Sequence, residues 1–227
     1  MTSVQMENKP LDESPSQCTL SIASGAAENF QTKLADPGPL GLIAFGMTTI
    51  LFNLTNARIF QMNTTTAGMV VCYGGSTQIL VGIMEFIRGN AFNCTITTTF
   101  GAFWLATACV WLLPRRTLET PTEYLEEAER GFMGIFFFMW AVFTFFMFAS
   151  AFRQPLAIMF VLFTAATNFT IQAISFWSDS ETIMKIAGYE GLICGMSALY
   201  CGLALTMNGS YDRTILPLSF PNRQHSD

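Results

Sequence analysis

The stretch 37–57, PGPLGLIAFGMTTILFNLTNA, decides the fold of this chain. It carries no charge and has about the 20 residues that a helix needs to cross a bilayer, so we predict a membrane-spanning helix. One side of that helix is not apolar. The residues that recur there at the spacing of a single helical face are Phe45, Thr48, Thr49, Phe52, Asn53 and Asn56. Because hydroxyl and amide groups facing lipid are costly, this side is predicted to face other helices or a polar path.

The composition extends this interpretation to the whole chain. Hydrophobic residues make up 51% and charged residues only 12%, whereas a soluble domain carries roughly 25% charged residues. We predict an all-α, polytopic membrane protein with six transmembrane helices per subunit, and a soluble phenylalanine-rich core is the disfavoured alternative. The expected spans are 39–57, 67–87, 94–113, 131–151, 155–177 and 186–207.

The charged residues gather outside these spans and suggest three parts. Residues 1–35 are rich in Ser, Pro and acids and lack the apolar core of a signal peptide, so we predict a disordered cytosolic tail. A six-helix transmembrane transport domain over residues 36–207 and a cytosolic C-terminal tail over 208–227 follow. The positive-inside rule does not fix the orientation, because the inner segments would hold six Lys and Arg residues and the outer segments five.

The residues that enzymes and metal sites need are missing from the predicted spans. The single histidine, His225, lies in the C-terminal tail, and the sequence has no P-loop, G-x-G-x-x-G or H-E-x-x-H motif. The six cysteines form no C-x-x-C pair or Cys/His cluster, so neither a metal site nor a disulfide framework is expected. The net charge of −5 and the absence of a basic patch argue against nucleic acid. We therefore expect no enzyme, no cofactor and no nucleic-acid partner.

The polar sides of the spans can instead form a pathway. Gln78 lies on one face of the second span and Asn168 on a polar face of the fifth. Together with aromatic rings, such hydroxyl and amide groups can replace part of the hydration of a small carboxylate without holding it by a fixed charge. The alternative is that these groups only bond the helices to one another, at roughly 0.6–2 kcal/mol each.

Two carboxylates within the spans are candidates for a proton-linked role, since an intramembrane acid is a functional hypothesis by default. Glu85 lies three residues before Arg88 and can simply pair with it near the interface. Glu190 lies near the start of its helix, where the helix dipole tolerates an acid. Both structural alternatives stay open.

Several blocks of the sequence match a known family in order and at similar spacing. The stretch Asp36-Pro37-Gly38-Pro39-Leu40-Gly41-Leu42 is similar to the signature N-P-A-P-L-G-L. Further matching blocks are 45–51 with Asn53, 73–75 with Gln78, Glu85 with 89–90, 101–105, 143–148 and 191–195. In these blocks the sequence resembles the acetate uptake transporter family, which includes bacterial succinate–acetate permeases and fungal acetate and ammonia-export proteins. The resemblance covers roughly residues 33–218.

The resemblance implies six helices per subunit, both termini in the cytosol, a hexameric ring and one pathway through each subunit. It also implies a hydrophobic constriction of Phe, Tyr and Leu type. Phe45 matches the Phe, Phe100 stands at the Tyr position, and the Leu falls within 162–165. The chain departs from the family pattern at Asp36, where the signature has Asn, and at Glu190, where an apolar or aromatic residue is common.

We therefore expect a transporter or channel for acetate and related small carboxylates, with succinate as a further candidate and with proton coupling through Glu85 or Glu190. Phe45 and Phe100 are the expected gate. Polar contacts along the path are assigned to Thr48, Thr49, Asn53, Gln78 and Asn168. The alternatives are a membrane acetate sensor or regulatory scaffold, and an ammonium or ammonia export channel. The expected location is the plasma membrane, with an organellar membrane as the alternative.

Overall fold

The structure is a computed structural model in which residues 34–113 and 128–219 are described. Within these ranges, six helical stretches are long and apolar enough to cross a membrane, which confirms the predicted all-α, six-span fold. The second span is built from three consecutive helices. In chain order the elements are α2 (Gly38–Asn56), α3 (Thr64–Gly68), the π-helix η1 (Met69–Thr77), α4 (Gln78–Ile87), α5 (Ala91–Leu112), α6 (Arg130–Ser150), α7 (Leu156–Ser178) and α8 (Glu181–Tyr211).

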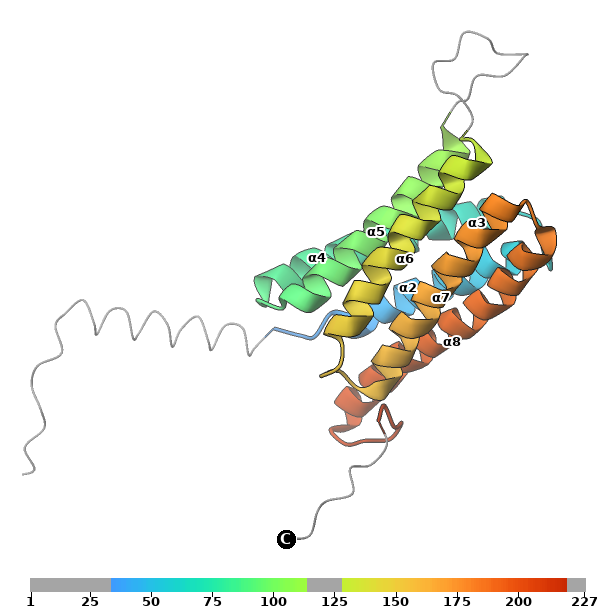
Figure 1. Cartoon of the computed structure of the whole chain (residues 1–227). Coiled ribbons are helices and arrows are strands. Elements are labelled where there is room, and N and C mark those ends of the chain that lie inside the picture. Colours follow the sequence, from blue (N-terminus) through green and yellow to red (C-terminus); the bar gives the residue numbers. More distant parts are fainter. Residues whose placement is uncertain (1–33, 114–127, 220–227) are drawn as a thin grey trace, which may run out of the picture.

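The six spans form a bundle in which neighbours run in opposite directions (Figure 1). Helix α2 packs on α8, α8 on α7, α7 on α6, and α4 on α5. We call the end of the bundle where α2, α5 and α7 begin the N-terminal end, and the opposite end the loop end. Most of the predicted tail over residues 1–35, and His225, lie outside the described residues.

Small residues let α2 and α8 approach closely. A Cβ atom on Gly46 would lie 2.6 Å from the backbone nitrogen of Leu199 and 2.8 Å from the carbonyl oxygen of Gly195. Such contacts leave no room for a side chain, which is the usual reason for small residues between helices in a bilayer. The small residues of α8, among them the Gly191-x-x-x-Gly195 pair, therefore lie on the face that packs on α2.

The middle of the second span is a π-helix, which the sequence pattern did not predict. Two hydroxyls of this segment also donate to backbone carbonyl groups five residues earlier in the chain. Ser76 Oγ donates to the carbonyl of Val71 at 3.0 Å, and Thr77 Oγ1 donates to that of Cys72 at 3.2 Å. Stretches of π-helix often occur at functional sites, and here Gly74 in η1 lies against Thr48 of α2.

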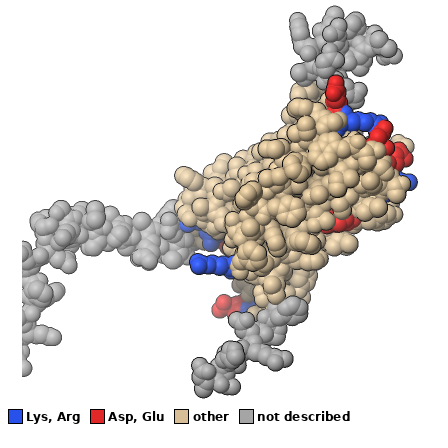
Figure 2. All heavy atoms as spheres, viewed as in Figure 1, with Lys and Arg blue, Asp and Glu red and all other residues tan. Residues whose placement is uncertain are grey.

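Most of the surface between the two ends of the bundle is uncharged. Figure 2 shows that on one face the charged side chains lie mainly toward the ends. Helix α6 presents large apolar side chains outward, and Phe146 is 71% exposed. In water such a surface would be very unfavourable, so the chain is a multi-pass membrane protein whose outer faces contact acyl chains or neighbouring subunits.

Residues after α8 fold back onto the N-terminal end of the bundle. Tyr200 donates its hydroxyl to the carbonyl of Pro217 at 2.7 Å, and the Ala157 amide donates to the carbonyl of Leu218 at 2.9 Å. These bonds fix residues 212–219 beside the start of α7. The cytosolic location of both tails stays a prediction.

Candidate functional site

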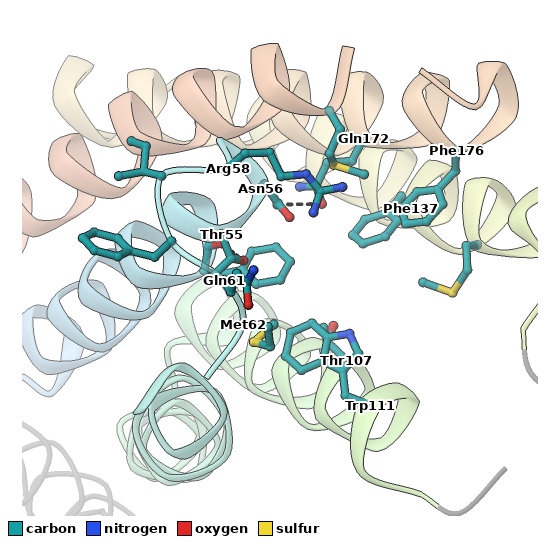
Figure 3. Close-up of a pocket in the computed structure, with 15 residues that line it drawn as sticks. Thr55, Asn56, Arg58, Gln61, Met62, Thr107, Trp111, Phe137, Gln172 and Phe176 are labelled. Carbon is teal, nitrogen blue, oxygen red and sulfur yellow. Dashed lines mark hydrogen bonds between the residues drawn. The ribbon is translucent and has the colours of Figure 1, made fainter. Parts of the chain in front are cut away.

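Three cavities follow one another through the bundle. The N-terminal cavity has a volume of about 200 Å³ and is lined by Asp36, Leu42, Gln78, Phe100 and Leu162, among others. The central chamber has only about 10 Å³. The loop cavity has about 700 Å³ and opens at the loop end, where Asn56, Arg58 and Thr107 line it (Figure 3).

Shared lining residues place these cavities in a row. Phe45 and Ala165 border both the N-terminal cavity and the central chamber. Phe52 and Gln172 border both the central chamber and the loop cavity. The three cavities therefore form one corridor from end to end, interrupted at two necks.

The corridor is closed in this structure. About 10 Å³ is roughly the space that a single water molecule needs, so the central chamber is too small for an organic acid. Aromatic rings close it from both sides. Phe45 lies with its ring centroid 5.2 Å from that of Phe100, and Phe52 lies 5.6 Å from Trp104. Passage of a solute requires these rings to move.

Amide side chains form a hydrogen-bonded chain beside the central chamber. Asn56 Nδ2 donates to Asn53 Oδ1 at 3.2 Å and to Gln172 Oε1 at 3.5 Å. Gln172 Nε2 donates to Asn168 Oδ1 at 2.5 Å. Asn53 and Asn168 also donate to backbone carbonyls at 2.9 Å and 2.6 Å. Each of these amides therefore has protein partners, and the chain fixes the polar wall of the chamber.

Two donors of the central chamber lack such partners. The hydroxyl of Thr49 and the indole N–H of Trp104 are buried without a hydrogen-bond partner among the described residues. Thr49 is 4% exposed and Trp104 is 2% exposed, and both residues line the chamber. An unpartnered buried donor costs about 1–3 kcal/mol, which a carboxylate oxygen in the chamber would recover.

The other predicted path residues lie in two different settings. Gln78 lines the N-terminal cavity, where its Nε2 donates to the carbonyl of Gly41 at 3.4 Å and its Oε1 is buried without a partner in the described part of the chain. Thr48 is buried against Gly74 instead and is not among the lining residues of the three cavities. The polar stripe of α2 therefore divides between the corridor and the contact with η1.

The signature segment forms the mouth of the N-terminal cavity. Asp36, Gly38, Gly41 and Leu42 line it, whereas Pro37, Pro39 and Leu40 do not. Asp36 Oδ1 accepts a hydrogen bond from the backbone N–H of Gly38 at 3.1 Å, so it satisfies a free donor at the start of α2.

An ion-pair cluster ties this mouth to the end of α4. Arg88 Nη1 donates to Asp36 Oδ1 at 2.6 Å and lies 3.5 Å from Glu85 Oε2. Glu85 is fully buried, and Asn93 Nδ2 donates to its Oε1 at 3.1 Å. Glu85 therefore has two partners and makes the pair with Arg88 that the spacing suggests.

Glu190 has a different environment. Its Oε2 is buried without a hydrogen-bond partner among the described residues, and Glu190 is not among the lining residues of the three cavities. It lies one turn before Cys194, which does line the central chamber. Of the two predicted carboxylates, Glu190 is thus the one beside the chamber with an unbonded oxygen.

The sequence analysis does not assign Trp104 or Ala165 to the path. It also does not assign Phe52 and Gln172, although Phe52 lies on the predicted stripe of the first span and Gln172 shares the polar face of the fifth span with Asn168. Trp104 lies in an apolar stretch where it reads as a packing residue. The sequence does offer one indication for Trp104: a tryptophan buried in an apolar span needs a hydrogen-bond acceptor for its indole N–H. Ala165 falls within the range expected to supply the constriction leucine, and Leu162 in the same range lines the N-terminal cavity.

These features are typical of one class of protein, the transporters and channels, since the chain is a polytopic helical membrane protein with a closed, polar-walled corridor. The chain belongs to the GPR1/FUN34/yaaH family, whose sequence profile matches residues 19–222. This membership confirms the resemblance inferred from the signature and the blocks that follow it.

Several similar proteins are named as transporters or channels. The succinate-acetate/proton symporter SatP of Escherichia coli K12 is 38% identical over 187 residues, which cover 82% of this chain and 96% of SatP. The ammonia transport outward protein 2 of Saccharomyces cerevisiae is 28% identical over 182 residues, covering 78% of this chain and 64% of that protein. A solved structure of the bacterial acetate channel SatP superimposes with a TM-score of 0.78 at 37% identity, over 82% of this chain and all of the other.

Proposed function

We propose that this protein moves acetate and related small monocarboxylates across a membrane through the corridor between α2, α5 and α7. The observation that carries the proposal is the row of three cavities with shared lining residues. The similarity to SatP over nearly its whole length supports the substrate class. Because the relatives of this chain are named as a symporter and a channel, we expect transport without enzymatic activity.

The two unpartnered donors give the central chamber its selectivity in this proposal. A carboxylate that loses its water needs replacement donors, since its transfer into a nonpolar medium costs tens of kcal/mol in the Born limit. The Thr49 hydroxyl and the Trp104 indole N–H supply two. The rings of Phe45 and Phe52 fit the methyl group and move aside to open the two necks.

Proton coupling is part of the proposal, with Glu190 as the proton-linked residue. An acid that crosses together with a proton avoids the cost of moving a bare charge. Glu190 has an unbonded carboxylate oxygen next to the chamber wall, whereas Glu85 already has partners in Arg88 and Asn93. We also propose the hexameric ring and the cytosolic tails that the family resemblance implies, and a location in the plasma membrane.

Flux into liposomes tests this function. The purified chain is reconstituted, and uptake of labelled acetate, propionate and succinate is measured at external pH 5.5 and pH 7.5, with protein-free liposomes as the control. We expect saturable acetate uptake that is faster at the lower pH. A folded protein that gives no acetate uptake contradicts the proposal and favours a sensor or scaffold.

The ammonia-export alternative predicts a different result in the same liposomes. It has support from the similarity to the yeast ammonia transport outward protein 2. Flux of labelled methylammonium without acetate flux would establish that alternative. Acetate flux without methylammonium flux would exclude it.

A further inference from the structure

The N-terminal mouth of the corridor has an acidic lining. The lining of the N-terminal cavity includes Asp36, and no described lining residue there is basic. The loop end carries both signs of charge: Arg58 lines the loop cavity and pairs with Glu181 at 3.7 Å, and both residues line a neighbouring cavity at that end.

The charge at the N-terminal mouth belongs to a cluster. Arg88 lies between Asp36 at 2.6 Å and Glu85 at 3.5 Å. Two carboxylates and one guanidinium leave the cluster with one formal negative charge. The Asp36 side chain is 55% exposed and that of Arg88 only 25%, so the negative group is the one that faces solvent at the mouth.

We propose that Asp36 makes the N-terminal mouth a charge filter, which admits monocarboxylates and slows dicarboxylate dianions. The inference rests on the proposed function. A dianion meets twice the repulsion that a monoanion meets, and one additional unit charge at about 10 Å in a partly aqueous mouth changes its occupancy roughly three- to tenfold.

A filter also predicts the effect of salt. Screening shortens the reach of a surface charge to about 10 Å at 0.1 M and about 3 Å at 1 M ionic strength. Transport of a dianion relative to a monoanion should therefore increase with ionic strength. This measurement needs no variant.

The test compares three labelled acids in liposomes of phosphatidylcholine at pH 7.5. Acetate is a monoanion, succinate is a dianion, and monomethyl succinate has the length of succinate with one charge. We expect Asp36→Asn to raise the succinate-to-acetate uptake ratio three- to tenfold and to leave the monomethyl succinate-to-acetate ratio within twofold. Asp212→Asn is the matched control, because Asp212 is exposed after α8 at the same end and adopts a left-handed φ of 50° that Asn tolerates. We expect Asp212→Asn to change neither ratio.

Each outcome bears on the proposal. An unchanged succinate-to-acetate ratio in an Asp36→Asn variant that still takes up acetate overturns the filter and leaves the proposed function standing. An equal rise for both larger acids also overturns it, because the mouth would then select by size. A wild-type ratio that does not rise between 0.02 and 0.5 M of an impermeant salt overturns the filter without any variant. Absence of acetate uptake by the folded wild-type protein overturns the proposed function and the filter together.

Discussion

At the residue scale, the central chamber joins residues that the sequence predicts with others that it does not. Thr49, Asn53 and Asn168 come from polar stripes with helical spacing, and all three line the chamber. Trp104 could not be found in this way, because an aromatic residue in an apolar run gives no periodic signal. Thr48 shares the stripe of α2 but lies against Gly74, since spacing along a helix does not say which neighbour each residue meets.

The donor role of Thr49 predicts the effect of a nearly isosteric change. Thr49→Val removes the hydroxyl and keeps the volume. A hydrogen bond to a charged group contributes about 1.5–3 kcal/mol, so the KM for acetate should rise roughly tenfold or more. Thr49→Ser keeps the hydroxyl, so its KM for acetate should stay within a few-fold of the wild-type value. Thr206→Val is the control, because it removes from α8 a hydroxyl that already donates to the carbonyl of Gly202. A wild-type KM in Thr49→Val would exclude Thr49 from substrate binding.

The neck formed by Phe45 predicts a change in substrate size. Phe45→Ala shortens a ring that borders both the N-terminal cavity and the central chamber. We expect uptake of propionate and butyrate to rise several-fold relative to acetate. Liposome uptake of an acid series measures this, with Phe146→Ala on the exposed side of α6 as control. If a folded Phe45→Ala variant keeps the wild-type size preference, Phe45 is not the gate.

The position of Glu190 predicts a change in pH dependence. Glu190→Gln removes the proton-binding group with little change in shape. After the uptake by protein-free liposomes is subtracted, we expect the ratio of acetate uptake at pH 5.5 to uptake at pH 7.5 to fall toward one. Glu181→Gln, at an exposed position on the same helix, is expected to keep the wild-type ratio. An identical pH profile in Glu190→Gln would remove this residue from proton coupling.

At the scale of elements, the sequence predicts the six spans, but it does not predict the full length of the last span or the π-helix within the second. Hydropathy and charge place each span, and all six appear at the expected positions. The last one is longer than expected, because α8 begins at Glu181 and ends at Tyr211 although its ends are polar. The π-helix η1 has no signature in the periodicity, since its wider turn depends on packing against α2 and α5.

The close contact of α2 and α8 predicts a stability effect. A Cβ on Gly46 meets backbone atoms of Leu199 and Gly195 that cannot move without shifting a helix. Overpacking of this kind costs about 1–3 kcal/mol, so Gly46→Ala should lower the melting temperature in detergent by several degrees. Gly209→Ala is the control, because a Cβ there has no neighbour within 4 Å. Equal melting temperatures of Gly46→Ala and wild type would contradict the described α2–α8 contact.

At the scale of the whole molecule, the corridor is a property of the assembled bundle. Its necks combine residues far apart in the sequence, such as Phe45 with Ala165 and Phe52 with Gln172. The sequence predicts polar sides on several spans, but only the fold brings them together. The charge at the N-terminal mouth likewise depends on the fold, because it brings Asp36 beside Arg88 and Glu85.

The most direct test of the corridor is to block it at the neck beside the central chamber. Ala165→Phe places a ring where the N-terminal cavity meets the chamber, while Ala149→Phe adds the same ring on the exposed side of α6. Uptake of labelled acetate by liposomes containing each variant is compared with wild type, at equal protein content and with folding checked by size exclusion. We predict that Ala165→Phe lowers acetate uptake at least tenfold and that Ala149→Phe does not. Wild-type uptake by a folded Ala165→Phe protein would show that acetate takes another route.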